Sequence, residues 1–355
     1  MTRWRVLILG FLLVAACSDG PTTPSPRARS YRMGFSNIPP SPDQAVAVAT
    51  LNLWALRADA AIMHVGVPWA AMLADTTAEA KVQAEMVPLA NFYRGHGFQL
   101  VVTVDVTDGL NRSAEAPELV ALGRSITDTA VQRLYREFVT AVDTMLHPDY
   151  LGLAAETNLI RVAAPAPVYD AVVTMTNDAA AEQRGLGTTA ALYVSVQVEV
   201  AWGKFSGSNV YEGIAQDRTD FPFVDALGLS SYPYLGGFAD PDQVPLDYYA
   251  RIDAGSQIPL LVVEGGWASQ SAGGFTTSPI IQARWIHHQA ELLDSARAVA
   301  VFQLSFADLA LSLFPPQPPG SILPLFATLG LVDTVLTPKP SLAVWDSVFA
   351  RRLRP

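Results

Sequence analysis

The sequence has few of the residues that most readily reveal a function. Its one cysteine, Cys17, excludes an internal disulfide framework and any multi-cysteine zinc site. Only 16% of the residues are charged, the formal net charge is −10, and no cluster of Lys and Arg could follow a phosphate backbone, so we expect no nucleic-acid partner. The chain lacks an H-E-x-x-H zinc motif and the G-x-S-x-G elbow of a serine hydrolase. We therefore expect neither a metal nor a cofactor.

The N-terminus has the pattern of an export signal. Arg3 and Arg5 precede an apolar run at 6–16, which is shorter than the roughly 20 residues that span a bilayer. Residues 1–16 therefore predict a signal peptide. The sequence VAAC, ending at Cys17, resembles the bacterial lipobox, which implies that Cys17 is lipidated and becomes the new N-terminus. An ordinary secretory signal with an incidental cysteine is the alternative.

The stretch 17–30 is rich in Pro, Ser and Thr and shows no apolar periodicity, which predicts a disordered tether. Ser18, rather than aspartate, follows the cysteine, and by analogy with Gram-negative lipoproteins this favours the outer membrane of the bacterial envelope. We expect an exported monomer whose only contact with the membrane is its lipid anchor.

From residue 31 to 355 we expect one domain in which apolar runs alternate with amphipathic stretches. The apolar runs predict strands at 31–36, 61–67, 99–106, 150–155, 191–198, 226–230, 259–263 and 298–304. Helices are predicted at 41–58 with Ser41 as N-cap, and at 77–96, 168–184, 245–254, 279–296 and 341–352. The clearest helix carries one apolar stripe formed by Val131, Leu134, Tyr135, Phe138, Val139 and Val142.

Eight such units in series, each with a continuously apolar strand, favour an α/β fold, a single-domain (β/α)8 TIM barrel. The rival is a doubly wound open sheet. The count of eight favours the barrel, and no G-x-G-x-x-G turn follows the first strand.

Two glutamates follow predicted strands at the end where barrel active sites lie. Glu156 follows the fourth strand and Glu264 follows the seventh, each directly behind residues that favour burial. A charge there is costly unless it is paired or functional. Retaining glycosidases need two carboxyl groups about 5–5.5 Å apart, one protonated and one ionised.

This arrangement resembles the clan A glycoside hydrolases, whose acid/base glutamate follows strand four and whose nucleophile follows strand seven. LGLSSYPYL at 227–235, LLVVEGGW at 260–267 and the ending at 330–345 are most similar to glycoside hydrolase family 53, the arabinogalactan endo-1,4-β-galactanases. The resemblance implies that Glu156 is the general acid/base and Glu264 the nucleophile.

One position departs from that family pattern. An asparagine normally precedes the acid/base and holds the sugar 2-hydroxyl, but here Ala155 stands in its place. Asn158 is the candidate substitute. Loss of a preorganised donor weakens transition-state binding by a few kcal/mol, so Ala155 puts high activity in question.

Further polar and aromatic residues near strand ends are candidate substrate contacts. Tyr232 resembles the clan's tyrosine that hydrogen-bonds the nucleophile, and tryptophans offer flat faces to sugar rings. The candidates are Asp105, Glu199, Tyr232, Gln303, Trp69, Trp202 and Trp267. His64, within the second strand, is expected to be a hydrogen-bonded core residue.

The main hypothesis is a retaining hydrolase of β-linked oligo- or polysaccharides, with β-1,4-galactan as one candidate. A catalytically weak or inactive glycan-binding barrel lipoprotein is the first alternative, supported by Ala155. A barrel enzyme that uses the two carboxylates for proton transfer on another substrate is the second.

Overall fold

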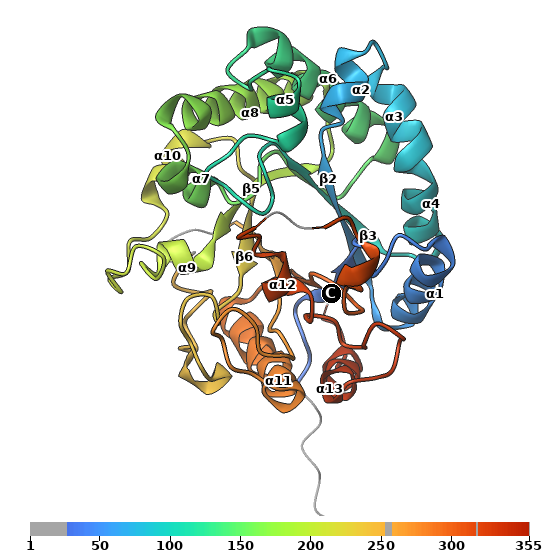
Figure 1. The fold of residues 1–355 in the computed structure, drawn as a ribbon, viewed down its shortest axis with the longest axis vertical. Helices are drawn as coiled ribbons and strands as arrows, with labels where there is room; N and C mark the ends of the chain where they lie inside the picture. The colour runs from blue at the N-terminus through green and yellow to red at the C-terminus, as the bar shows by residue number, and fades with distance from the viewer. Residues whose placement is uncertain (1–26, 253–257, 317–318, 355) are drawn as a thin grey trace, which may run out of the picture.

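The computed structural model describes residues 27–252, 258–316 and 319–354. In these ranges eight parallel strands close into a barrel, each pairing with the next along the chain and β8 with β1 (Figure 1). The strands are β1 (Arg32–Ser36), β2 (Ala60–Gly66), β3 (Gln99–Asp105), β4 (Tyr150–Gly152), β5 (Ala191–Gln197), β6 (Ala226–Ser231), β7 (Leu260–Gly265) and β8 (Ala300–Gln303). The predicted single-domain (β/α)8 barrel is confirmed.

Helices surround the barrel, as Figure 1 shows. They are α1 (Gln44–Trp54), α2 (Trp69–Leu73), α3 (Ala78–Glu85), α4 (Val87–Gly95), α5 (Pro117–Ala121), α6 (Thr129–Leu146), α7 (Thr157–Ala163), α8 (Ala166–Leu186), α9 (Val198–Ala201), α10 (Ala215–Asp220), α11 (Pro279–Ala296), α12 (Leu323–Phe326) and α13 (Pro340–Phe349), with 3-10 turns η1 (Ala55–Arg57), η2 (Pro241–Gln243) and η3 (Leu311–Leu313). Within the described ranges, no helix combines the length and the apolar character needed to cross a bilayer.

Three helix predictions need correction. The N-cap of α1 is Asp43, whose Oδ1 accepts hydrogen bonds from two backbone N–H groups of the first turn, rather than Ser41. The predicted helix 77–96 is two helices, because Pro88 lacks the N–H that would continue the ladder of α3. The part of the predicted helix 245–254 that is described forms turns instead.

The start of the described chain belongs to the folded domain. Arg29 lies within the predicted tether but is 4% exposed. Its backbone N–H donates to Arg352 O at 3.0 Å and its guanidinium pairs with Asp59 at 2.6 Å. Residue 29, within the range of the predicted tether, thus contacts the folded domain. Cys17 and the predicted signal peptide lie outside the described residues.

Alternation along the strands divides the apolar side chains into two layers. One set fills the barrel and the other packs between strands and helices, as residue pairs such as Ile62 and Met63 show. Tyr193 is the largest side chain of the inner set, and its hydroxyl lies 2.5 Å from Thr103 Oγ1. A Cβ at Gly152 would lie 2.6 Å from the Tyr193 ring, so glycine is required there. This packed interior forms the base on which the mouth of the barrel rests.

Candidate active site

Glu264 is turned into the barrel mouth by an irregularity between β6 and β7. Val263 belongs to the cluster inside the barrel and Val262 to the outer one, so simple alternation would turn Glu264 outward. The pairing slips by one residue, because Leu229 opposes Val262 whereas Ser230 opposes Glu264. Such a bulge re-aims the side chain that follows it, and Glu264 lines the pocket at the mouth.

Glu156 reaches the same region from the segment that follows β4. Its backbone is left-handed, with φ 51° and ψ 45°, which costs a non-glycine residue about 1–2 kcal/mol. Its N–H donates to Ser195 Oγ at 2.9 Å, and α7 begins at the next residue. The Glu156 side chain is held in a buried position, with the whole residue 7% exposed. Strain of this kind is concentrated at functional sites.

An arginine that the sequence did not single out joins Glu156 to Asp105. Arg112 Nε donates to Glu156 Oε2 at 2.8 Å, and its Nη1 lies 2.7 Å from both carboxylate oxygens of Asp105. Nη1 also donates to Thr107 Oγ1 at 3.0 Å. In the sequence Arg112 is one basic residue in a polar loop between β3 and α5, and no spacing marks it. Asp105 thus contributes to the site by holding Arg112.

Tyr232, at the end of β6, holds the other carboxyl group. Its hydroxyl donates to Glu264 Oε1 at 2.6 Å, and the tyrosine residue is 2% exposed. Its ring meets Phe326 edge to face, with the ring centroids 4.9 Å apart. The hydrogen bond that the sequence analysis expects between Tyr232 and Glu264 is therefore present.

Burial raises the pKa of both glutamates. For Glu156, the Arg112 charge lowers the pKa and the Glu264 charge raises it, so the two carboxyl groups lie close enough to influence each other. For Glu264, the hydrogen bond from Tyr232 is the main factor that lowers the pKa. Ser230 Oγ makes no hydrogen bond of regular geometry in the described structure, yet this hydroxyl lies near enough to lower the pKa of both carboxyls.

The mouth contains a pocket of about 240 Å³. Its strand-borne residues are polar, and those on the loops are mostly apolar. The polar lining comprises His64, Thr103, Asp105, Arg112 and Glu264, and the apolar lining comprises Ile38, Leu110, Leu304, Leu309, Leu323 and Phe326, with Gly109 and Ala155 completing it. Ala155, at the position of the family's asparagine, therefore faces the site without offering a hydrogen bond.

His64 is a core residue, but its ring is not held by a hydrogen bond of regular geometry. Neither ring nitrogen has such a partner among the described residues and both are inaccessible to water, although the backbone of Val263 lies close enough to favour the protonated ring. Its backbone, by contrast, is held by Asn37, which accepts from His64 N at 2.9 Å and donates to His64 O at 3.3 Å. Burial lowers the pKa of His64 to about 4, against the opposing charge of Asp105, so the ring is neutral at neutral pH.

The three candidate tryptophans do not line this pocket. Trp69 and Trp267 are almost fully buried in the layer between strands and helices. Trp202 stacks on Tyr248, with the ring centroids 5.0 Å apart, and its Nε1 donates to Tyr248 O at 3.0 Å. The structure therefore assigns these rings to packing, because strand-end position alone does not specify the side-chain direction.

Asn158 and Gln303 are occupied by backbone contacts. Asn158 Oδ1 accepts from Gln197 N at 2.7 Å, and its Nδ2 donates to Gln197 O at 2.9 Å, which ties α7 to β5. Asn158 is fully buried and therefore does not replace the missing asparagine. Gln303 Nε2 donates to Leu329 O at 2.7 Å, and its Oε1 has no partner in the described part of the chain.

Glu199 belongs to a separate buried cluster beside β6. Its Oε1 accepts from Tyr248 OH at 3.0 Å and from Ser231 Oγ at 3.3 Å. Burial raises its pKa to about 7. Neither Glu199 nor Glu156 lines the pocket, but Glu156 is joined through Arg112 to Asp105, which does. The side-chain hydrogen bonds of Glu199 lead to Tyr248 and Ser231 instead, so Glu199 lies apart from the proposed pair.

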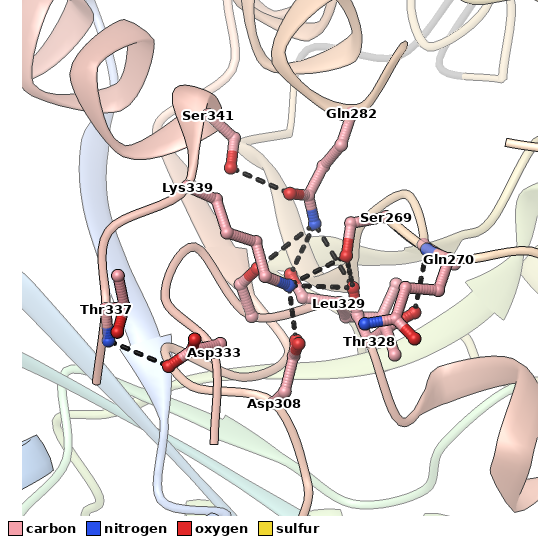
Figure 2. A network of polar contacts seen from close by, with 12 residues as sticks. Ser269, Gln270, Gln282, Asp308, Thr328, Leu329, Asp333, Thr337, Lys339 and Ser341 are labelled. Atoms are coloured by element: carbon pink, nitrogen blue, oxygen red, sulfur yellow. Dashed lines mark hydrogen bonds and ion pairs between the residues drawn. The ribbon is translucent and has the colours of Figure 1, made fainter. Parts of the chain in front are cut away.

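A buried polar network holds the long segment after β8 against the barrel (Figure 2). Lys339 Nζ donates to Asp308 Oδ1 at 2.5 Å, Ser269 Oγ at 2.8 Å and Gly330 O at 2.8 Å. Gln282, on α11, adds a hydrogen bond from Nε2 to Gly330 O at 3.1 Å. This network fixes the segment that carries the apolar wall of the pocket.

The described residues contain no cluster of three or more His, Cys, Asp or Glu side chains suited to hold a metal ion. The chemistry offered by the mouth is that of two carboxyl groups with distinct partners. One is paired with a guanidinium and the other accepts from a phenol, so their environments differ although the charge of Glu264 acts on Glu156.

Comparison with known proteins adds the fold context. No protein-family model matches the sequence, and no curated protein matches it. A solved GH5_18 structure from Bifidobacterium longum subsp. longum, in complex with Manβ1-4GlcNAc, superposes with a TM-score of 0.61 at 16% identity, covering 92% of this chain and 80% of that one. The exo-β-1,4-mannosidase Op5Man5 from Opitutaceae bacterium strain TAV5 superposes with a TM-score of 0.58 at 16% identity, covering 91% of this chain and 59% of that one.

The β-D-glucuronidase of Dictyoglomus thermophilum gives a TM-score of 0.57 at 14% identity, covering 91% of this chain and 51% of that one. The chain thus spans about half the length of the β-glucuronidases it matches. At these identities the likeness concerns the fold: this chain shares the (β/α)8 barrel on which those glycosidases are built.

Proposed function

We propose that this protein hydrolyses β-glycosidic bonds with retention of anomeric configuration, using Glu156 as general acid/base and Glu264 as nucleophile. The supporting observation is geometric: Glu264 lines the pocket at the mouth of the closed barrel, and Arg112 joins Glu156, on the segment after β4, to Asp105 of the same pocket. The fold shared with glycosidases of β-linked sugars supports the same proposal.

The partners of the two glutamates suit different roles. Glu264 accepts a short hydrogen bond from Tyr232, which favours the ionised form that attacks the anomeric carbon. Burial and the nearby Glu264 charge raise the pKa of Glu156, which favours the protonated form that donates to the leaving oxygen. As the glycosyl-enzyme forms, the charge on Glu264 is lost, so Glu156 then ionises more readily and acts as base toward water.

A glycan-binding barrel with weak or no turnover is the second candidate. Two observations favour it: Ala155 offers no hydrogen bond to the sugar, and the ion pair of Arg112 with Glu156 stabilises the ionised form of the acid. Glycan binding in calorimetry without hydrolysis by the wild type would support this candidate over the first.

The deciding experiment removes the nucleophile and replaces it with a small anion. We expect Glu264→Ala to lower kcat/KM on aryl β-glycosides by more than about a thousandfold, the scale of losing a covalent nucleophile. Azide should restore turnover by forming a carbon–nitrogen bond at the anomeric carbon while the aryl alcohol leaves, giving a glycosyl azide of inverted configuration. The substrates are aryl β-galactosides, glucosides, mannosides and glucuronides.

The matched control is Glu137→Ala, an exposed glutamate on α6, which should leave turnover unchanged. Proton NMR of the first-formed sugar should show the β anomer for the wild type. Undiminished hydrolysis by Glu264→Ala, or an α anomer as first product, would contradict the proposed roles.

Two further parts of this proposal concern the substrate of the enzyme and its location in the cell. The family 53 resemblance keeps β-1,4-galactan among the candidate substrates, and a galactan digest with analysis of the released oligosaccharides tests it. We also propose that the mature chain is lipidated at Cys17 and anchored in the bacterial outer membrane. Cys17→Ser should release the protein from the membrane fraction.

A further inference from the structure

We infer that the leaving group of the substrate is apolar, an aryl or alkyl alcohol rather than a second sugar. This inference rests on the proposed function and identifies the class of substrate. It excludes β-1,4-galactan, whose leaving group is a sugar, so the galactan digest also tests it. It starts from the division of the pocket into a polar floor and an apolar rim.

The polar floor is carried by the strands. Four polar lining residues lie in the last three residues of their strands and therefore deepest in the mouth. They are His64 on β2, Thr103 and Asp105 on β3, and Glu264 on β7. The bond to be cleaved must lie beside Glu264, because that carboxylate attacks the anomeric carbon. The sugar ring therefore occupies the floor.

The apolar rim is carried by segments that follow the strands, including the short helix α12. Ile38 follows β1, Leu110 follows β3, and Leu304, Leu309, Leu323 and Phe326 follow β8. Each of these side chains is at least partly exposed, so the rim presents hydrocarbon to whatever extends from the floor. The chain after β8 also exposes two apolar side chains outside the pocket, Leu313 at 60% and Ile322 at 39%.

The rim offers a second sugar little to bind. Its six apolar side chains carry no hydrogen-bonding group, and the charged residues below them, Asp105 and Arg112, are already paired with each other. Sugar hydroxyls pressed against leucine would lose water without replacement, which costs free energy for each unpaired group. None of the three candidate tryptophans supplies a stacking face.

The size of the pocket agrees with one sugar and a short apolar group. About 240 Å³ is below the 300–1,000 Å³ typical of pockets for drug-sized ligands. The floor therefore holds a single sugar unit, and the leaving group crosses the rim toward solvent.

A chain-length series tests this inference with leaving groups of equal intrinsic reactivity. The probes are methyl, butyl and hexyl β-glycosides of the sugar that the aryl panel identifies, or of galactose if none is turned over, together with the β-1,4-linked disaccharide of the same sugar. We expect kcat/KM to rise by up to about fourfold for each methylene that the rim covers. The disaccharide should be a poorer substrate than the hexyl glycoside.

Two variants locate the effect. Leu323→Asn should bring the ratio of kcat/KM for butyl over methyl glycoside toward one, because it replaces rim hydrocarbon with an amide. Leu313→Asn is the matched control on the same segment, outside the pocket, and should keep the wild-type ratio. Thermal unfolding of both variants shows whether they remain folded.

The outcomes separate this inference from the proposed function. A flat chain-length series, or faster hydrolysis of the disaccharide, would overturn the apolar leaving group while hydrolysis itself stands. Absence of any hydrolysis would overturn the proposed function. In that case calorimetry decides the inference: tighter binding of hexyl than methyl glycoside supports the apolar rim, and equal binding overturns it.

Discussion

Replacing Tyr232 with phenylalanine removes one oxygen atom from the site and tests whether Glu264 must be ionised. The tyrosine hydroxyl donates to Glu264 Oε1 at 2.6 Å. A hydrogen bond to a charged group is worth about 1.5–3 kcal/mol. Since each 1.36 kcal/mol is tenfold in rate, kcat/KM should fall by about 12- to 160-fold if the full bond is used in the transition state. The edge-to-face contact with Phe326 is kept, because the ring remains.

The pH dependence of kcat/KM shows in which direction Tyr232→Phe changes the pKa of Glu264. Tyr232 lowers the pKa of Glu264, so the phenylalanine variant raises that pKa. A nucleophile must be deprotonated, and the acidic limb of kcat/KM reports its pKa in the free enzyme. The acidic limb should therefore move to higher pH in Tyr232→Phe.

Tyr169→Phe is the matched control. Its hydroxyl also donates to a carboxylate, Asp220 Oδ2 at 2.7 Å, but it lies on α8 in the outer shell. We expect the control to keep the wild-type kcat/KM and pH profile. If Tyr232→Phe retained kcat/KM within twofold and left the acidic limb in place, the role of Glu264 as an ionised nucleophile would be refuted.

The remaining predictions concern two cations that pair with buried carboxylates, Arg112 and Lys339. Arg112→Gln should move the alkaline limb of kcat/KM to higher pH and lower its maximum, because Arg112 lowers the pKa of Glu156 and orients it. Lys339→Met should lower the free energy of unfolding by about 3–5 kcal/mol at pH 7.5, because it leaves the Asp308 carboxylate buried without its cation. The loss should shrink at pH 5: burial raises the pKa of Asp308 from 3.8 to about 6, so the native state retains a proton that the unfolded chain releases.

Controls for these variants come from exposed ion pairs. Arg124→Gln breaks an i,i+4 pair on the surface and should leave the alkaline limb unchanged. Arg284→Met, at an exposed pair with Asp240, should leave the denaturation midpoint near that of the wild type. An unmoved alkaline limb in Arg112→Gln, or an equal loss at both pH values in Lys339→Met, would contradict the assigned electrostatics.

Arg112 also bears on why this site departs from the clan A pattern. The position that normally supplies an asparagine is Ala155, and the carboxyl of Glu156 instead receives its hydrogen bond from a charged residue on the loop after β3. The arginine keeps Glu156 in place, but it also stabilises the ionised form of this carboxyl group. In the proposed mechanism, proton donation by Glu156 requires burial to outweigh this ion pair, which is the direction that the raised pKa of Glu156 indicates.

The sequence alone determined the barrel architecture and the end of the barrel at which Glu156 and Glu264 lie. Continuous apolar runs can be satisfied only where both faces of a strand are covered, and eight of them in alternation with amphipathic stretches close into a barrel. Because parallel strands share one carboxyl end, Glu156 and Glu264 could be assigned to the same mouth from their places after the fourth and seventh runs.

Only the tertiary structure decided which way the side chains point and what they meet. Glu264 faces the pocket because β7 slips by one residue against β6, and that slip depends on a neighbouring strand rather than on local alternation. Arg112, which binds Glu156, lies on a loop 44 residues earlier in the chain. Trp267, expected to contact the sugar, is instead buried between the strands and the helices. Strand periodicity is a local property, whereas ion pairing, register and the apolar rim depend on segments distant in the chain that meet only once the barrel has closed.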